Sequence, residues 1–249
     1  LYLGSFKPFV LLSQNMLPFE WSESRRYGWS ALTLKFWLLR WGQIRSFRRA
    51  EGAFFLSAYA RSVIQQMAGL SGRYPIIPLG VNQEFFCAPR EQRPLAEYSF
   101  ARPFRLLYVS KLEPYKHHTK VIEAVAQLRR EGLPVSLELI GGPERQNVWQ
   151  AVESARQQAD AKGEFIHYSG YCPYEQLVAR YHQTDAFVFA SSCENLPTIL
   201  LEAMAAGLPI ACAERGPMPE TLGQAGRYFD PEQPTSIAEA VRQLKNKGH

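Results

Sequence analysis

The chain has 249 residues, of which 46% are hydrophobic and 20% are charged, so it can bury one large core or two smaller ones. Its formal net charge of +5 arises in residues 1–100, which hold 12 basic and 6 acidic side chains, whereas residues 101–249 hold 16 and 17. The four cysteines show no Cys-x-x-Cys spacing. This pattern supports neither a disulfide framework nor a zinc site, and it indicates a reducing, cytoplasmic setting.

The first hundred residues show short apolar runs separated by two helical patterns. We expect strands near 8–13, 53–57 and 75–79, and helices near 29–49 and 58–68. We assign 1–88 to a partial N-terminal domain and the proline-rich, charged stretch 89–103 to a linker. Because this first part is small and does not begin with Met, we expect the chain to lack its beginning.

The segment 25–49 contains seven basic residues, no acidic residue and many aromatic ones. One helical face carries Leu34, Trp37, Leu38, Trp41 and Ile44. Such a helix can lie in an anionic membrane interface, or it can pack its apolar stripe on its own sheet. Basic residues interrupt every apolar run, so it cannot span a bilayer. No nucleic-acid-binding motif accompanies the basic residues.

From residue 104 onward, strand and helix patterns alternate, which predicts an α/β domain over 104–249 with a parallel sheet and right-handed crossovers. The expected strands lie near 104–109, 135–140, 164–168, 186–190 and 208–212. The expected helices lie near 116–130, 146–161, 174–183, 198–206 and 235–246.

Two lysines, Lys111 and Lys116, follow the first strand of this part and precede a helix. Strand, loop and helix start together form an anion site. An ammonium about 4 Å from a phosphate oxygen is worth roughly 4 kcal/mol before desolvation at the dielectric usual near protein surfaces. The chain has only three aspartates, none near another in sequence, so we expect a diphosphate site without a metal. We interpret His117 and His118 as a surface pair.

The sequence Ser-Ser-Cys-Glu-Asn-Leu-Pro-Thr-Ile-Leu-Leu-Glu carries Glu194 in a loop and Glu202 in the helix that follows. Pro197 suits a helix start, and Gly207 marks its end. The preceding run 187–190 predicts a strand, which puts the motif at the carboxyl end of a sheet, where ligands bind. We interpret the two glutamates as acceptors for sugar hydroxyls. A Ser-His-Asp site stays open, although the Gly-x-Ser-x-Gly elbow, the P-loop and Gly-x-Gly-x-x-Gly are all missing from the sequence.

Together these motifs resemble the retaining glycosyltransferases of the glycogen-synthase-like family four, also called glycosyl transferases group 1. The resemblance covers about 145 residues, from Pro103 to the end, and includes Leu-Glu-Leu-Ile-Gly-Gly, Tyr-Ser-Gly-Tyr and Arg-Gly-Pro-Met-Pro-Glu. It implies the two-domain GT-B fold, with a Rossmann-like C-terminal domain that binds the nucleotide-sugar donor and an incomplete Rossmann-like N-terminal domain on the acceptor side.

The resemblance also implies roles for single residues. Glu194 would contact the donor sugar, Glu202 the ribose, and Lys111 and Lys116 the diphosphate. The remaining implied contacts to the donor come from Ser110, Gly170, Tyr171, Asn195, Leu196 and Thr198.

Two departures from the family pattern affect these roles. Ser110-Lys111 stands where the family usually has Gly-Arg, and a lysine lacks the forked contact of arginine. Asn195-Leu196-Pro197 stands where the family often has a glycine-rich turn, and Pro197 offers no N–H.

We therefore expect a metal-independent hexosyltransferase that moves a sugar from UDP- or GDP-sugar to a saccharide or lipid-linked acceptor, without a cofactor. We expect it in the cytoplasm, with contact to the inner membrane face through 25–49. The alternatives are a nucleotide-sugar binding module without turnover and a GT-B epimerase or phosphorylase.

Overall fold

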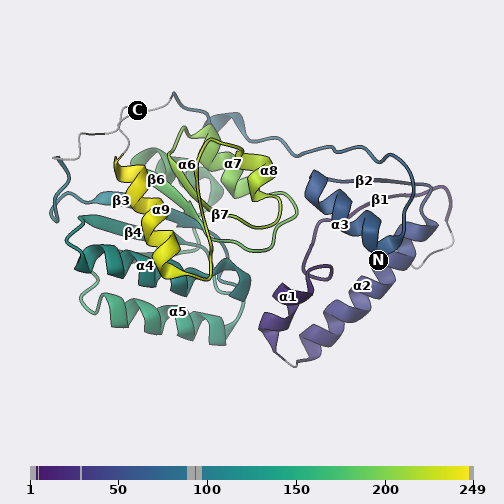
Figure 1. Cartoon of the computed structure of the whole chain (residues 1–249), viewed down its shortest axis with the longest axis horizontal. Coiled ribbons are helices and arrows are strands. Elements are labelled where there is room, and N and C mark those ends of the chain that lie inside the picture. The colour runs from purple at the N-terminus through teal and green to yellow at the C-terminus, as the bar shows by residue number, and fades with distance from the viewer. Residues whose placement is uncertain (1–3, 5, 29, 89–92, 94–96, 247–249) are drawn as a thin grey trace. The chain divides into compact units, whose positions relative to one another are not determined.

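The computed structural model describes residues 4, 6–28, 30–88, 93 and 97–246. The chain divides into two compact units (Figure 1). Unit 1 comprises Leu1–Gly80, Cys193–Pro197 and Gly216–Thr221. Unit 2 comprises Val81–Ser192, Thr198–Arg215 and Leu222–His249. Part of the predicted linker, residues 89–92 and 94–96, lies outside the described residues.

Unit 2 is built on a six-stranded sheet in which every neighbouring pair is parallel. The strand order is β5-β4-β3-β6-β7-β8, so the chain builds one half of the sheet outward from β3 and the other half outward from β6. The strands are β3 (Phe104–Val109), β4 (Val135–Ile140), β5 (Ile166–Gly170), β6 (Ala186–Phe189), β7 (Ile210–Ala213) and β8 (Arg227–Phe229).

Helices connect these strands, and α4 lies between α5 and α9 (Figure 1). The central strands are buried at nearly every position, as expected for a parallel sheet that is covered on both faces. The helices and 3-10 turns are η2 (Gln83–Phe85), η4 (Pro114–Lys116), α4 (His118–Arg130), α5 (Gln146–Ala159), α6 (Tyr174–Gln183), α7 (Thr198–Ala205), α8 (Met218–Leu222) and α9 (Pro234–Asn246).

The predicted parallel α/β sheet is confirmed, and most element bounds agree within two residues. The strand β5 begins two residues later than predicted because the Asp160 carboxylate accepts hydrogen bonds from the backbone N–H groups of Glu164, Phe165 and Ile166, at 2.9, 2.7 and 2.7 Å. These bonds hold the residues before Ile166 in a loop. The short elements α8 and β8 were not predicted, because five and three residues are too few for a periodic signal.

Unit 1 contains a parallel pair of strands, β1 (Val10–Leu12) and β2 (Gly52–Phe54). The connection between them holds α1 (Trp21–Ser24), η1 (Arg25–Tyr27) and α2 (Ala31–Arg49), and α3 (Ala58–Ala68) follows β2. Phe47 of α2 stacks on Phe55 at a ring-centroid distance of 5.8 Å, and both rings are buried. This contact anchors the C-terminal part of α2 in the small core of the unit.

The strand predicted near 75–79 is wrong. Only an isolated bridge forms there, between Phe55 and Ile76, with hydrogen bonds of 3.0 Å from Phe55 N to Pro75 O and 2.8 Å from Ile77 N to Phe55 O. The ladder stops because Ser57, two residues beyond Phe55, caps the N-terminus of α3, so the partner chain turns away. Pro78 also lacks the backbone N–H that a ladder needs.

The helix α2 exposes the N-terminal part of its predicted apolar face. Leu34, Trp37, Leu38 and Trp41 are between 51% and 62% exposed, whereas Phe36 and Phe47 point into the unit. The interpretation that this stripe packs on its own sheet is therefore wrong for these four residues. Trp29, which the predicted range included, lies outside the described residues. Within the part of the chain that the structure describes, no helix has both the length and the apolar character that crossing a membrane requires.

A close backbone approach at Gly141 joins the ends of β3 and β4. A β-carbon at this residue would lie 1.9 Å from the Ser110 carbonyl oxygen, and its φ of 140° suits glycine alone. Ser110 N donates to Ile140 O at 2.8 Å, and Gly141 N donates to Gly170 O at 2.8 Å. The glycine thus lets three strand ends meet.

We predict that Gly141→Ala destabilises the protein by about 3 kcal/mol or more, because the added methyl group clashes with a backbone oxygen in a conformation that only glycine adopts easily. The neighbouring Gly142 has no atom within 4 Å of an added β-carbon, so Gly142→Ala is the matched control. Chemical denaturation of both variants measures the difference. Equal unfolding midpoints would show that the strand ends can separate at no cost.

Candidate functional site

The sheet of unit 2 has a topological switch point between β3 and β6. The chain leaving β3 continues to β4 on one side, and the chain leaving β6 continues to β7 on the other side. In open α/β sheets, ligands bind beyond the carboxyl ends of the strands at such a point. The loop after β3 carries Ser110, Lys111 and Lys116, and the chain after β6 continues through Ser191 and Ser192 toward Glu194. The predicted lysine loop therefore lies at the expected edge.

Lys111 is an exposed side chain with a carboxylate partner. Its Nζ lies 2.6 Å from Glu144 Oε1, and its side chain is 73% exposed. The hydrogen bond from Lys111 lowers the pKa of Glu144. Ser110, which precedes it, is buried, and its Oγ donates to Lys111 O at 2.9 Å. Because exposed ion pairs contribute little to stability, an anionic ligand can replace Glu144 as the partner of Lys111.

Lys116, in contrast, is only 7% exposed. Its Nζ lies 5.1 Å from the ring centroid of Tyr115 and 5.4 Å from that of Phe189, at the end of β6. A desolvated ammonium over aromatic faces is attracted by the ring quadrupoles. Tyr108 OH donates to Lys116 O at 2.6 Å, which fixes the backbone as well. The two lysines thus provide one exposed and one buried positive charge.

The histidine pair that follows is buried, so its interpretation as a surface pair is wrong. His117 is in the left-handed region, with a φ of 49°, and links η4 to α4. His118 stacks on Tyr108 at a centroid distance of 4.7 Å. Burial lowers the pKa of His118 to about 3, with help from the nearby Lys116 charge, so this imidazole is neutral at pH 7. No signal in the sequence indicates that either histidine is buried, because their burial depends on contacts with Tyr108 of β3 and with Ser192 in the chain after β6.

Glu202 lies on α7, half-buried. Its Oε2 accepts a hydrogen bond from Tyr181 OH at 3.1 Å. Burial raises the pKa of Glu202, and the bond from Tyr181 only partly opposes this shift. Tyr181 is itself fully buried and stacks on Phe187 of β6 at 5.5 Å. The carboxylate is therefore held by a rigid aromatic residue in a poorly solvated place. Thr198, one helical turn earlier, is also half-buried.

Glu194, Asn195 and Leu196 belong to unit 1 and are described with that unit. Glu194 and Leu196 are half-buried, and Asn195 is buried. Asn195 Nδ2 donates to Ser13 O, and Ser57 Oγ donates to Asn195 O at 2.7 Å. These bonds tie the segment to the residue after β1 and to the N-cap of α3. The sequence pattern gave no sign of this scaffold role for Asn195.

Gly170 and Tyr171 lie at the end of β5. Gly170 has a φ of 65°, and its carbonyl accepts from Gly141 N. Tyr171 is 82% exposed. Tyr168 OH donates to Gly141 O at 2.9 Å, so the ends of β4 and β5 are joined by both backbone and side chain. The exposed ring of Tyr171 is available to stack on a planar group.

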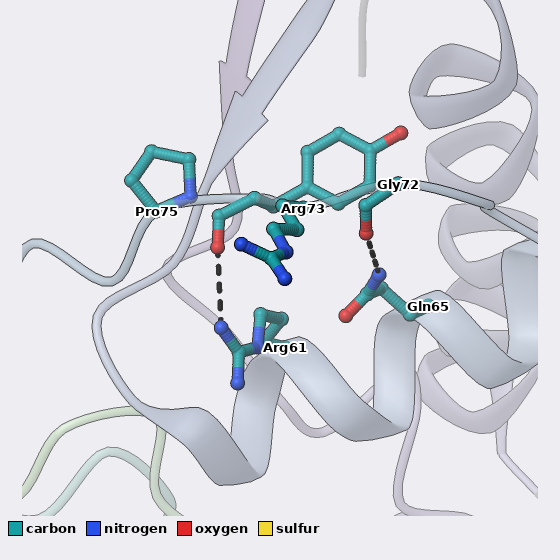
Figure 2. Close-up of a pocket in the computed structure, with 6 residues that line it drawn as sticks. Arg61, Gln65, Gly72, Arg73 and Pro75 are labelled. Atoms are coloured by element: carbon teal, nitrogen blue, oxygen red, sulfur yellow. Dashed lines mark hydrogen bonds between the residues drawn. The ribbon is translucent and has the colours of Figure 1, made fainter.

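A cavity of about 680 Å³ lies within unit 1, between α3 and the segment 72–75, and none of the predicted site residues lines it (Figure 2). Arg61 Nη1 donates to Tyr74 O at 3.3 Å, and Gln65 Nε2 donates to Gly72 O at 3.1 Å. These two side chains hold the segment against the helix. Among the residues with described positions, no three His, Cys, Asp or Glu side chains are grouped so that they could hold a metal ion.

Sequence comparison finds relatives among bacterial glycan-building enzymes. The family described as Glycosyl transferases group 1 matches residues 95–248. The O-antigen chain mannosyltransferase B of Escherichia coli is 31% identical over 160 residues, which cover 63% of this chain and 41% of the relative. The GDP-mannose-dependent alpha-(1-6)-phosphatidylinositol monomannoside mannosyltransferase of Mycolicibacterium smegmatis is 29% identical over 232 residues, which cover 87% and 58%. The chain thus spans about half the length of these curated relatives.

Solved structures share the fold. Sucrose-phosphate synthase of Thermosynechococcus elongatus has a TM-score of 0.76 at 20% identity, over 96% of this chain and 59% of that one. HepE of Anabaena, in complex with UDP and glucose, has a TM-score of 0.74 at 17% identity, over 97% and 63%. These neighbours have the GT-B fold, which confirms the predicted fold class. The family match covers more than half of the chain, and the chain therefore belongs to the glycosyl transferases group 1.

Proposed function

We propose that this chain is the donor-binding part, with some of the acceptor side, of a retaining, metal-independent hexosyltransferase. The enzyme moves a sugar from UDP- or GDP-sugar to an acceptor hydroxyl in polysaccharide or glycolipid assembly. Family membership supports the reaction class. One relative is named for GDP-mannose and HepE was solved with UDP, so both nucleotides are candidates. The domain assignment 1–88, 89–103 and 104–249 is part of this proposal.

The observation that carries the proposal is the pair of lysines at the switch point. Both follow β3: the ammonium of Lys116 lies over Phe189 at the end of β6, and Lys111 reaches into solvent. A nucleoside diphosphate leaving group develops negative charge as the bond from the anomeric carbon to the phosphate oxygen breaks. Ammonium groups that are already in place stabilise that charge without reorganisation. The acceptor oxygen then bonds to the same face of the sugar, and its proton leaves with the diphosphate.

The other proposed roles are those that the resemblance to the family implies. Glu194 stabilises positive charge on the donor sugar, and Glu202 accepts hydrogen bonds from ribose hydroxyls. Gly170 and Tyr171 line the base pocket, where the exposed ring stacks on the base. The remaining donor contacts come from Ser110, Asn195, Leu196 and Thr198.

Metal independence is supported by what the three aspartates do. Asp160 accepts three backbone hydrogen bonds before β5, Asp185 pairs with Arg105 at 3.2 Å, and Asp230 pairs with Arg215 at 3.2 Å. Each carboxylate therefore already has a structural partner. The lysines supply the positive charge that a divalent ion would otherwise bring. We therefore propose that no cofactor takes part.

The exposed face of α2 supports contact with an anionic lipid surface at the cytoplasmic side of a membrane. Its apolar half carries two tryptophans, and the basic half that follows carries Arg45, Arg48 and Arg49, all exposed. Tryptophan suits the interface between headgroups and acyl chains, and arginine suits anionic headgroups. The acceptor is then a lipid-linked or membrane-associated saccharide.

The function is tested first by nucleotide binding. We predict that the chain binds UDP or GDP in titration calorimetry, and that Lys116→Ala weakens binding at least about tenfold, because a charge-assisted contact to phosphate contributes about 1.5 to 3 kcal/mol. Lys162→Ala is the control, since this lysine is 84% exposed and lies in the loop after α5. An equal loss of nucleotide affinity in both variants would contradict the proposed role of Lys116.

Transfer is the second arm of this test, measured as radiolabelled product from UDP- and GDP-sugars. Glu194→Ala should abolish transfer while the affinity for the nucleotide is largely kept. Binding without transfer by the full enzyme would favour the binding-module alternative instead.

We predict that Glu202→Gln raises the thermal stability at neutral pH. Burial raises the folded-state pKa of Glu202 above 4.5, so the charged form is disfavoured and its stability contribution falls as pH rises through the folded pKa. Glutamine carries no charge there. The melting temperature of the variant should exceed that of the wild type at pH 8, and the difference should vanish below about pH 4.

The control is Glu123→Gln on the exposed face of α4, which should change little at either pH. The Glu202 variant should also bind UDP or GDP more weakly, because the amide loses one of the two acceptor oxygens. If Glu202→Gln has the same melting temperature and the same nucleotide affinity as the wild type, Glu202 does not belong to the site.

We predict that the chain binds vesicles containing phosphatidylglycerol but not those of phosphatidylcholine alone. Trp37→Ala/Trp41→Ala should lower the bound fraction by at least about tenfold, since burying one large apolar side chain contributes about 1.5 to 3 kcal/mol. The matched control is Ile77→Ala/Leu79→Ala, which removes comparably exposed apolar side chains from another segment of unit 1. Sedimentation that is equal for both double variants would contradict contact through α2.

A further inference from the structure

His117 holds an unusual position between the turn of Lys116 and the helix α4. It is the one residue other than glycine with a positive φ among the described residues, at 49°, and it is buried. Side chains other than glycine, asparagine and aspartate rarely adopt this conformation, because the β-carbon crowds the following carbonyl. Strained residues of this kind persist where surrounding contacts hold them, often at functional sites.

The contact that holds His117 comes from Ser192, in the chain after β6. His117 Nε2 lies 2.9 Å from Ser192 Oγ. Ser192 Oγ donates its proton to Tyr115 O at 3.1 Å, and Ser192 N donates to the same oxygen at 2.9 Å. The hydroxyl of Ser192 thus lies within hydrogen-bond distance of both His117 Nε2 and Tyr115 O, and the imidazole tautomer sets which atom donates in the bond between His117 and Ser192.

These bonds hold both neighbours of Lys116 to one residue. Tyr115 and His117 are joined to Ser192, and the carbonyl of Lys116 itself accepts from Tyr108 OH. The turn is thereby tied to β3 through Tyr108 and to the chain after β6 through Ser192. A lysine side chain has high rotamer entropy. Because the backbone and the ring contacts of Lys116 are already fixed, the side chain loses less conformational entropy when it binds an anion.

We propose that His117 and Ser192 form a latch that positions Lys116 for the diphosphate of the donor. This inference rests on the proposed function, because it assumes that Lys116 binds the diphosphate of the donor. The latch also connects the lysine loop to the chain that follows β6, within unit 2. His117 acts through Lys116 and is a positioning residue.

Two substitutions of His117 separate positioning from folding. His117→Gly removes the imidazole and relieves the backbone strain, so the melting temperature should stay near that of the wild type while the dissociation constant for UDP or GDP rises about threefold to tenfold. His117→Gln keeps a group that can donate or accept a hydrogen bond, but it also keeps a β-carbon in the strained conformation. It should retain most of the affinity and gain no stability.

A double-mutant cycle completes the test. Ser192→Ala should weaken nucleotide binding about as much as His117→Gly, and the double variant should weaken it no further, because both changes open the same latch. Additive effects of the two substitutions, or an unchanged affinity in His117→Gly, would contradict the latch. The proposed function would still stand in that case, provided that Lys116→Ala weakens nucleotide binding. Wild-type protein that binds neither UDP nor GDP, or an unaffected Lys116→Ala variant, would overturn the proposed function and the latch with it.

Discussion

The parallel pairing of β3 with both β4 and β6 is the constraint on which unit 2 depends. Parallel strands put all their carboxyl ends at one edge, so the loops that follow them meet there whatever their separation in sequence. Residues 80 positions apart, such as Lys111 and Ser191, thereby start from adjacent strands. The same pairing requires the close backbone approach at Gly141, where three strand ends meet.

Charge at this edge is divided between two environments. Lys111 stands in solvent beside Glu144, so its ammonium is screened and can change partners. Lys116 lies between aromatic rings and is held by its backbone on both sides, so its charge is poorly screened and fixed in place. An anion that reaches the edge meets one adaptable cation and one preorganised cation. Glu202 is a comparable case, a carboxylate held where burial disfavours its charge.

Unit 1 uses its hydrophobic residues differently. Its buried aromatic residues form a small core around Phe47 and Phe55, while equally large side chains on α2 remain in solvent. In the proposed contact with a lipid surface, these exposed tryptophans would leave water for the interface, and the absence of acidic residues over 25–49 would avoid repulsion from anionic headgroups. The segment 193–197 is tied to the same unit through Asn195, Ser13 and Ser57.

The sequence alone determined the parallel α/β sheet, the place of the lysine loop after β3 and the extent of α6 and α7, because these depend on periodicity and on helix start and stop residues within short segments. Only the tertiary structure decided the burial of His117, the partners of Lys116 and Lys111, and the exposed face of α2. Each of these depends on which distant residue packs against the segment, as Ser192 does for His117. The strand predicted near 75–79 does not form for the same reason. Its partner segment makes one bridge, at Phe55, and then begins α3.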